Sequence, residues 1–245
     1  MHTSLKSMLF AALLVVTTSA AAQTSTSKNA GASPRLLTPQ NSALVLIDHQ
    51  PQMAFAAQSM ETQLLINNVT GLTKAAKIFK VPTILTTVAS ETFSGPIFPT
   101  IQAVFPEQTP IDRTTMNSWE DKRVVEAVQK TGRKKVVMAA LWTEVCLATA
   151  ALSALDDGYE VYFVSDASAG VSKEAHEMAI QRMVQAGVVP ITWGVFGAEL
   201  QRDWARTDTV PAMAQILIEH SGNVGTSFQW EQQLLNSAAP VKAGV

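Results

Sequence analysis

The chain has 245 residues, of which 47% are hydrophobic and 16% are charged, and its formal net charge is −2. This near-neutral balance provides no basic stripe with interleaved aromatic residues, so nucleic acid is excluded as an expected partner. A single cysteine excludes a disulfide framework within the chain and leaves a free or intermolecular thiol.

The N-terminus has the pattern of an export signal. Lys6 precedes an apolar run at residues 8–16, and the small residues Ala20-Ala21-Ala22 follow. The apolar run is about half as long as the roughly 20 residues that a membrane-spanning helix needs. We therefore predict a signal peptide over residues 1–22, an exported protein that is periplasmic or secreted with no membrane contact after cleavage, and a flexible polar leader over residues 23–37.

Apolar runs alternate with helical patterns over residues 38–222, which we assign to one domain. The expected strands cover residues 43–48, 82–88, 109–112, 135–140, 160–165 and 188–192. The expected helices cover residues 62–79, 119–130, 145–155, 173–186, 198–206 and 210–220. This alternation predicts an α/β fold, a three-layer α/β/α sandwich with a doubly wound, mainly parallel six-stranded sheet. Residues 223–245 are expected to form a polar tail that is either disordered or packed on a neighbour.

Three reactive side chains fall where the expected strands end. Asp48 closes the first strand, Arg113 follows the third and Cys146 follows the fourth. In a doubly wound fold, ligands bind beyond the carboxyl ends of the strands. If Thr143 caps the next helix, Cys146 lies in its first turn, where free N–H groups favour a thiolate. We therefore predict Cys146 as a nucleophile, Asp48 as its general base, and the backbone N–H groups of Thr143 and Cys146 as oxyanion donors.

Each of these residues also has a structural interpretation. Cys146 is a small hydrophobe that can simply begin a core helix. An aspartate at a strand end commonly caps a loop, which applies both to Asp48 and to Asp166 after the fifth strand. Arg113 lies in a proline-containing loop, where an arginine is commonly solvated. The residue pattern alone leaves these alternatives open.

Four segments resemble the isochorismatase-like hydrolases: LIDHQ at residues 46–50, VPTILTT at 81–87, TEVC at 143–146 and VSDAS at 164–168. Two later segments, ITWG at residues 191–194 and ELQRDW at 199–204, are similar to the YcaC-like branch of that superfamily. The resemblance covers residues 38–220. It implies an Asp, Lys, Cys triad, a cis peptide bond just before the nucleophile loop, and a homo-oligomer.

Carried over residue by residue, the triad falls on Asp48, Arg113 and Cys146, and the cis peptide is expected at Trp142–Thr143. Arginine replaces the family's lysine and stays charged at neutral pH, so Arg113 is expected to stabilise the thiolate without acting as an acid or base. Nicotinamidases of the superfamily carry an Asp and His metal cluster. The four histidines of this chain, at positions 2, 49, 176 and 220, are not paired at ligand spacing, so neither a metal nor another cofactor is expected.

The sequence thus predicts a cysteine hydrolase that acts on a small amide-like or related carbonyl substrate through a thioacyl intermediate. Aromatic side chains are candidates for the wall of a small apolar substrate pocket, although they can equally be core residues: Phe55, Trp119, Trp142 and Trp193. One alternative is vinyl-ether hydrolysis of an isochorismate-like acid. Another is a redox-responsive or ligand-binding protein that uses the thiol without turnover.

Overall fold

The computed structural model describes residues 32–237. The predicted signal peptide, the leader up to residue 31 and the last eight residues lie outside the described residues. The leader was predicted to extend to residue 37, but the folded unit begins at Pro34. Leu37 is fully buried, and its backbone N–H donates to Glu199 Oε2 at 2.6 Å. These contacts make residues 34–37 part of the folded unit.

A six-stranded, fully parallel sheet forms the centre of the molecule, with the strand order β3-β2-β1-β4-β5-β6. The strands are β1 (Ser42–Ile47), β2 (Thr83–Val88), β3 (Ile111–Arg113), β4 (Lys135–Ala140), β5 (Glu160–Val164) and β6 (Val189–Ile191). Every residue of β1 and β4 is buried, which explains why both strands are continuous apolar runs after their first residues, Ser42 and Lys135. The predicted doubly wound α/β fold is confirmed, and the strand order reverses between β1 and β4, where such folds bind ligands.

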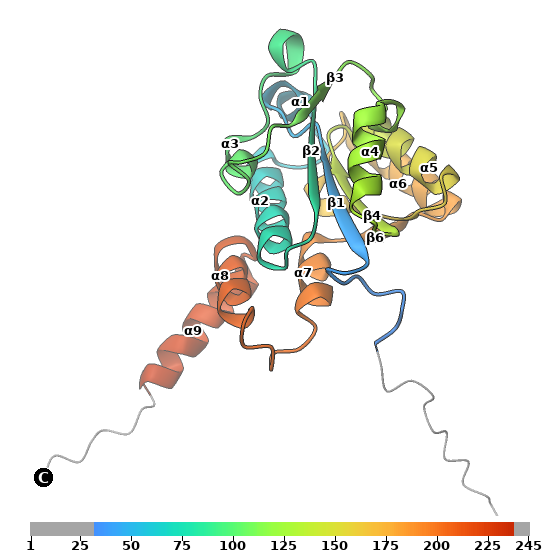
Figure 1. The fold of residues 1–245 in the computed structure, drawn as a ribbon. Coiled ribbons are helices and arrows are strands. Elements are labelled where there is room, and N and C mark those ends of the chain that lie inside the picture. The colour runs from blue at the N-terminus through green and yellow to red at the C-terminus, as the bar shows by residue number, and fades with distance from the viewer. Residues whose placement is uncertain (1–31, 238–245) are drawn as a thin grey trace, which may run out of the picture. The chain divides into compact units, whose positions relative to one another are not determined.

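Helices cover both faces of this sheet, with α2 on one side and α4, α5 and α6 on the other (Figure 1). The helices are α1 (Pro51–Ala56), α2 (Thr62–Ile78), α3 (Pro99–Gln102), α4 (Lys122–Lys130), α5 (Ala148–Asp156), α6 (Lys173–Ala186), α7 (Trp193–Gln201), α8 (Val210–His220) and α9 (Asn223–Ser237). Four single turns complete the described elements: the π-helical η1 (Ser90–Ser94) and η3 (Thr143–Leu147), and the 3₁₀-helical η2 (Ser118–Glu120) and η4 (Ser165–Ala167). Within residues 32–237, every helix is too short or too polar to span a membrane.

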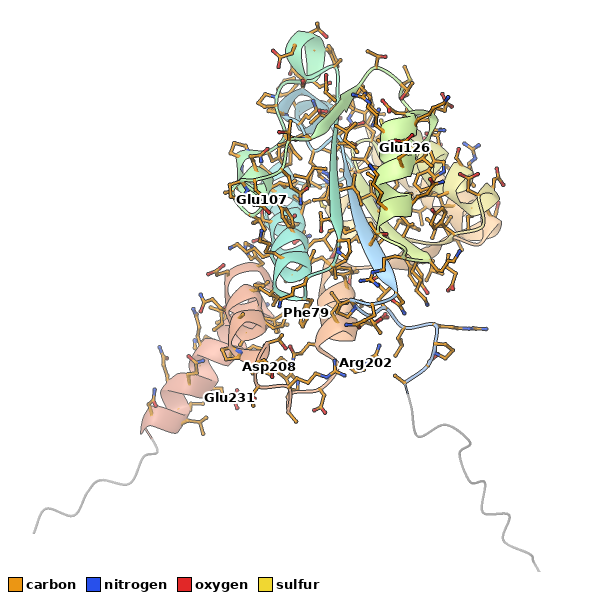
Figure 2. All side chains as sticks on the ribbon, in the orientation of Figure 1. Phe79, Glu107, Glu126, Arg202, Asp208 and Glu231 are labelled. Atoms are coloured by element: carbon orange, nitrogen blue, oxygen red, sulfur yellow. The ribbon has the colours of Figure 1, made fainter. Side chains whose placement is uncertain are left out.

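The helices are held to the sheet by apolar stripes. On α4, Val124 and Val128 are fully buried, whereas Glu126 lies on the exposed face of the same helix (Figure 2). Residues four apart lie on one face of a helix, and a residue midway between them lies on the opposite face. The sequence pattern of this segment therefore determines which side of α4 faces the core.

Several elements differ from the sequence prediction. The helix predicted at residues 198–206 is α7, which begins at Trp193 because the Thr192 side chain caps its first turn, and ends where Arg202 takes a positive φ of 58°. A helix, α9, occupies most of the segment predicted as a tail. The short helices α1 and α3 were not predicted. Each begins with a proline in its first turn, where the missing N–H costs nothing.

Candidate active site

Asp48 lies directly after β1, at the edge of the sheet that carries the carboxyl ends of the strands. Its φ of 59° is left-handed, a conformation that aspartate tolerates better than most residues but that still stores strain. Its N–H donates to Thr86 O at 3.2 Å, and its side chain is fully buried. The chain therefore turns sharply at the end of β1 and leaves a carboxylate inside the protein.

Arg113 ends β3 and pairs with this carboxylate. Its Nη2 donates to Asp48 Oδ2 at 2.6 Å, and both side chains have zero exposure. Its Nη1 donates to the carbonyl oxygens of Thr115 and Met116. The alternative of a solvated loop arginine is therefore wrong. The guanidinium contacts Asp48 directly, whereas the sequence prediction had assigned it to the thiolate.

Cys146 lies in η3, between β4 and α5, and is buried at 3% exposure. Burial and the neighbouring Asp48 carboxylate raise the pKa of its thiol to about 12, while Arg113 and a backbone hydrogen bond from Trp142 lower it. Burial also raises the pKa of Asp48 to about 6, and the opposing effects of Arg113 and Cys146 lower it. Both shifts favour a neutral thiol beside the Asp48 carboxylate at neutral pH, whereas the sequence pattern predicted that the helix terminus and Arg113 favour the thiolate.

The turn that carries Cys146 departs from the sequence prediction in three respects. The cis peptide bond joins Leu141 to Trp142, one residue earlier than predicted. Thr143 does not cap the helix, because its hydroxyl lies 2.8 Å from His176 Nδ1 and is used in that hydrogen bond. Its N–H donates to Ala169 O at 3.0 Å, so this amide is not free to act as the predicted oxyanion donor.

A cavity of about 180 Å³ opens onto Cys146. Its apolar lining comes from Met53, Val88, Phe93, Met116, Trp142 and Val145, and its polar lining from Ser94, Thr114 and the cysteine itself. Trp142 is fixed in this wall because its Nε1 donates to Met53 O at 2.8 Å. The side chains of Phe93 and Met116 are largely exposed and form the mouth of the cavity.

Of the four aromatic residues predicted to wall the pocket, Trp142 lines this cavity. Trp119 instead packs edge-on against Tyr159 and donates from Nε1 to Asp157 at 2.7 Å. Trp193 is buried against His220. Phe55 is 86% exposed on α1 and does not line the cavity. Sequence position alone did not distinguish the wall residue from the core residues, because long-range packing decides this difference.

Gln50 is a positioning residue that the sequence analysis did not single out. Its fully buried side chain accepts from Val88 N at 2.9 Å and donates to Val88 O at 3.1 Å and to Gly95 O at 2.5 Å. These three bonds tie the end of β1 to both sides of η1, which carries Phe93 and Ser94. A glutamine three residues after a strand gives no sequence signal for such a role, since its partners lie about 40 positions away.

The histidines among the described residues all make hydrogen bonds within the fold. His49 Nε2 lies 2.9 Å from Ala167 O, and burial lowers the pKa of His49 to about 4. His220 lies against Asn67 and Lys74. Asp166 accepts from Trp193 N at 2.8 Å, which is the predicted loop-capping role. Among residues 32–237, no three His, Cys, Asp or Glu side chains gather closely enough to hold a metal ion.

Asp48, Arg113 and Cys146 lie buried at the carboxyl ends of the strands of a doubly wound α/β sheet. A family model described as the isochorismatase domain matches residues 42–194, which is more than half of the chain. The chain therefore belongs to the isochorismatase family of hydrolases.

Within this family the chain is similar to YcaC proteins. The probable hydrolase YcaC of Escherichia coli strain K12 is 37% identical over 181 residues, which are 74% of this chain and 86% of the relative. The crystal structure of E. coli YcaC, an octameric hydrolase of unknown specificity, is 34% identical with a TM-score of 0.78 and covers 83% of this chain and 100% of its own. The structure of YcaC from Pseudomonas aeruginosa with hexane-2,5-diol and covalent acrylamide is 31% identical with a TM-score of 0.77. The match covers 82% of this chain and 100% of the P. aeruginosa chain.

Proposed function

We propose that this protein is a cysteine hydrolase that cleaves a small amide-like or related carbonyl substrate through a thioacyl intermediate. The observation that carries the proposal is the buried ion pair of Arg113 and Asp48 next to Cys146, whose thiol is electrostatically coupled to Asp48, beside a small cavity. Asp48 Oδ1, the oxygen that Arg113 does not use, has no hydrogen-bond partner among the described residues. A nucleophile next to a base that is itself oriented by a third group is the arrangement that activates a thiol or hydroxyl.

Asp48 is the general base in this proposal. Its pKa of about 6 leaves it ionised at neutral pH and close enough to that pH to return the proton efficiently. When the thiol proton moves to Asp48, the repulsion between the thiolate and the carboxylate disappears, and the positive charge of Arg113 then stabilises the thiolate. The high pKa of the thiol therefore prevents a resting thiolate but does not prevent proton transfer coupled to attack.

The chemical steps balance with water as the only co-substrate. Cys146 Sγ forms a bond to the carbonyl carbon, and the carbonyl oxygen becomes an oxyanion. The bond to the amine or alcohol breaks, and this leaving group takes the proton from Asp48. Asp48 then accepts a proton from water, and the water oxygen bonds to the thioester carbon. The bond from this carbon to Sγ breaks, and the departing thiolate takes the proton back from Asp48, which releases the acid and the free thiol.

The oxyanion donors need to be reassigned. Thr143 N–H is used by Ala169, and the N–H groups of Val145 and Leu147 both donate to Trp142 O. We therefore assign this role to the N–H groups of Glu144 and Cys146, in the first turn of the helical segment, where backbone dipoles favour negative charge.

Arg113 acts through Asp48 in this scheme. It keeps the buried carboxylate ionised, holds its orientation and supplies positive charge when the proton moves. Since a guanidinium does not lose its proton in this pH range, it does not transfer a proton itself. The exchange from the family's lysine is compatible with hydrolysis only if Asp48 carries the proton.

Covalent acrylamide in P. aeruginosa YcaC supports a reactive nucleophile in this branch, since acrylamide is an electrophile that thiols attack. The test is turnover of a panel of short amides and esters by the parent protein and by Cys146→Ala. Samples are quenched with acid during turnover, and the mass of the protein and its peptides is measured by mass spectrometry. We expect an acyl adduct on the peptide that contains Cys146, and loss of turnover in the variant. Full turnover by Cys146→Ala would refute the proposal.

We also propose that the protein is exported and forms a homo-oligomer. Export is supported by the sequence pattern of residues 1–22. Assembly is supported by the octameric state of E. coli YcaC. Light scattering of the purified mature protein tests the second point, and a monomer at micromolar concentration would contradict it.

A further inference from the structure

The cavity beside Cys146 offers no positive charge to a substrate. None of the described residues that line it is charged, and its polar side-chain groups are two hydroxyls and the thiol. Its volume of about 180 Å³ is below the roughly 300 to 1,000 Å³ that holds a drug-sized ligand. Only a short molecule therefore fits, and its polar groups must be satisfied by few partners.

The nearest charges behind the cavity cancel each other. Arg113 donates to Asp48 at 2.6 Å, and its other terminal nitrogen is used by backbone carbonyl oxygens. Both charged side chains have zero exposure. A substrate carboxylate in the cavity would therefore lose its water without gaining a cation, and burial of an unpaired carboxylate is strongly unfavourable.

One polar group in the lining is unused. Ser94 is fully buried, and its hydroxyl has no hydrogen-bond partner among the described residues. Its position is fixed, because its N–H donates to Ala89 O at 3.1 Å and the next residue, Gly95, accepts from Gln50. A buried hydroxyl without a partner costs free energy, so a ligand group that bonds to Ser94 would be favoured in this cavity.

We infer that this cavity selects short, uncharged carbonyl compounds, that Ser94 is the residue that hydrogen-bonds the polar group of the substrate, and that molecules with a carboxylate near the reacting carbon are rejected. This inference rests on the proposed function and names its substrate class. It also separates the protein from a hydrolase of isochorismate-like acids, which must accommodate carboxylates.

Two alkylating reagents of nearly equal size test the charge selection without any knowledge of the natural substrate. Iodoacetamide is neutral and iodoacetate is anionic, and each forms a bond from Cys146 Sγ to its methylene carbon while iodide leaves. The ratio of the two labelling rates is divided by the same ratio for 2-mercaptoethanol, a neutral free thiol. We expect the folded protein to favour iodoacetamide by at least roughly 10-fold after this correction, as an uncompensated buried charge requires.

A positive charge added at the mouth of the cavity should weaken the preference for iodoacetamide over iodoacetate. Met116 lines the cavity and Leu234 lies on α9, and both are 69% exposed. Met116→Lys should reduce the preference for iodoacetamide by about 3- to 10-fold at low ionic strength, and less in salt. Leu234→Lys adds the same charge elsewhere and should leave the preference unchanged.

The role of Ser94 is tested with a matched control. Ser118 is also fully buried, with an unpartnered hydroxyl, but it does not line the cavity. Ser94→Ala should slow labelling by iodoacetamide by about 3- to 10-fold, the effect of one net hydrogen bond, while Ser118→Ala should not. Equal effects of the two variants would overturn the role of Ser94.

The outcomes distinguish this inference from the proposed function. Labelling by iodoacetamide with a corrected ratio near one would overturn the charge selection and leave Cys146 as a reactive nucleophile. Absence of labelling by either reagent in the folded protein would overturn the proposed function and, with it, this inference.

Discussion

Removal of Arg113 should destabilise the protein by an amount that depends on pH. In Arg113→Met, the Asp48 carboxylate stays buried and loses its partner at 2.6 Å. Breaking a fully buried ion pair from one side typically costs about 3 to 5 kcal/mol. The protein can escape this cost only if Asp48 takes up a proton, so the cost should vanish at a pH where the carboxyl is already protonated.

Whether stability rises or falls with pH follows from the direction in which folding shifts the pKa of Asp48. It is raised from 3.8 to about 6 in the folded state, so this group's contribution to stability is fully present below the unfolded value and is lost as pH rises through the folded value. In the parent, the loss of this contribution to the unfolding free energy is complete a little above pH 6. It amounts to about 3 kcal/mol, because each pKa unit between 3.8 and about 6 corresponds to 1.36 kcal/mol. In Arg113→Met the Asp48 pKa rises further, because both effects of Arg113 that lower it are absent, and the loss continues to higher pH.

The difference in unfolding free energy between parent and variant should therefore be smallest near pH 5, where it reflects the lost hydrogen bonds from Arg113 to Thr115 and Met116. Above about pH 6 it should grow by at most about 1.4 kcal/mol per pH unit, which adds nearly 3 kcal/mol by about pH 8. Urea denaturation at several pH values measures this difference in unfolding free energy. The protein concentration is kept constant, because assembly changes the apparent stability. Arg113→Lys keeps a positive charge and should show a smaller pH dependence. A difference that is the same near pH 5 and near pH 8 would refute this reasoning.

Three further outcomes are expected. Gln50→Ala removes three buried hydrogen bonds to Val88 and Gly95, the residues on either side of η1. The variant should lower the unfolding free energy by about 1 to 3 kcal/mol in urea denaturation and raise KM more than it changes kcat. An unchanged KM would contradict its positioning role. Dialysis against a chelator should leave turnover unchanged, and loss of activity restored only by Zn²⁺ or Fe²⁺ would contradict the metal-free site. Mass spectrometry of protein exported by its native host should find a mature chain that begins near Gln23, whereas an intact Met1 on the exported protein would contradict processing.

The arrangement of strands was predictable because it depends on local patterns. Strands β1 and β4 are continuous apolar runs, and helices with their own periodicity separate the strands, so the parallel sheet follows from the chain alone. The positions of Asp48 and Cys146 at the carboxyl ends of the strands also follow, since the polarity of a parallel sheet fixes which loops meet.

The details of the site were less predictable because they depend on contacts between distant segments. Thr143 has the residue type of a helix cap, but His176 on α6 takes its hydroxyl. The pKa of the Cys146 thiol depends on burial and on Asp48, which raise it by more than Arg113 and the backbone hydrogen bond from Trp142 lower it. The choice of Trp142 over Trp119 as a wall residue depends on packing that no local pattern encodes. α9 was missed because its segment is mostly polar and lacks a stripe that faces the core: among its described residues, Gly225 is the one that is buried.

The central claim is that Asp48 activates the thiol of Cys146, and the pH dependence of its alkylation tests this claim most directly. The measurement is the rate at which iodoacetamide labels Cys146 in the folded protein from about pH 5 to pH 10, for the parent and for Asp48→Asn. If Asp48 accepts the proton, the parent rate should rise through the Asp48 pKa of about 6 and then level off, and this inflection should be absent in Asp48→Asn. A parent rate that increases roughly tenfold per pH unit up to pH 10, as expected of a buried thiol with no base, or labelling only in denaturant, would contradict the account.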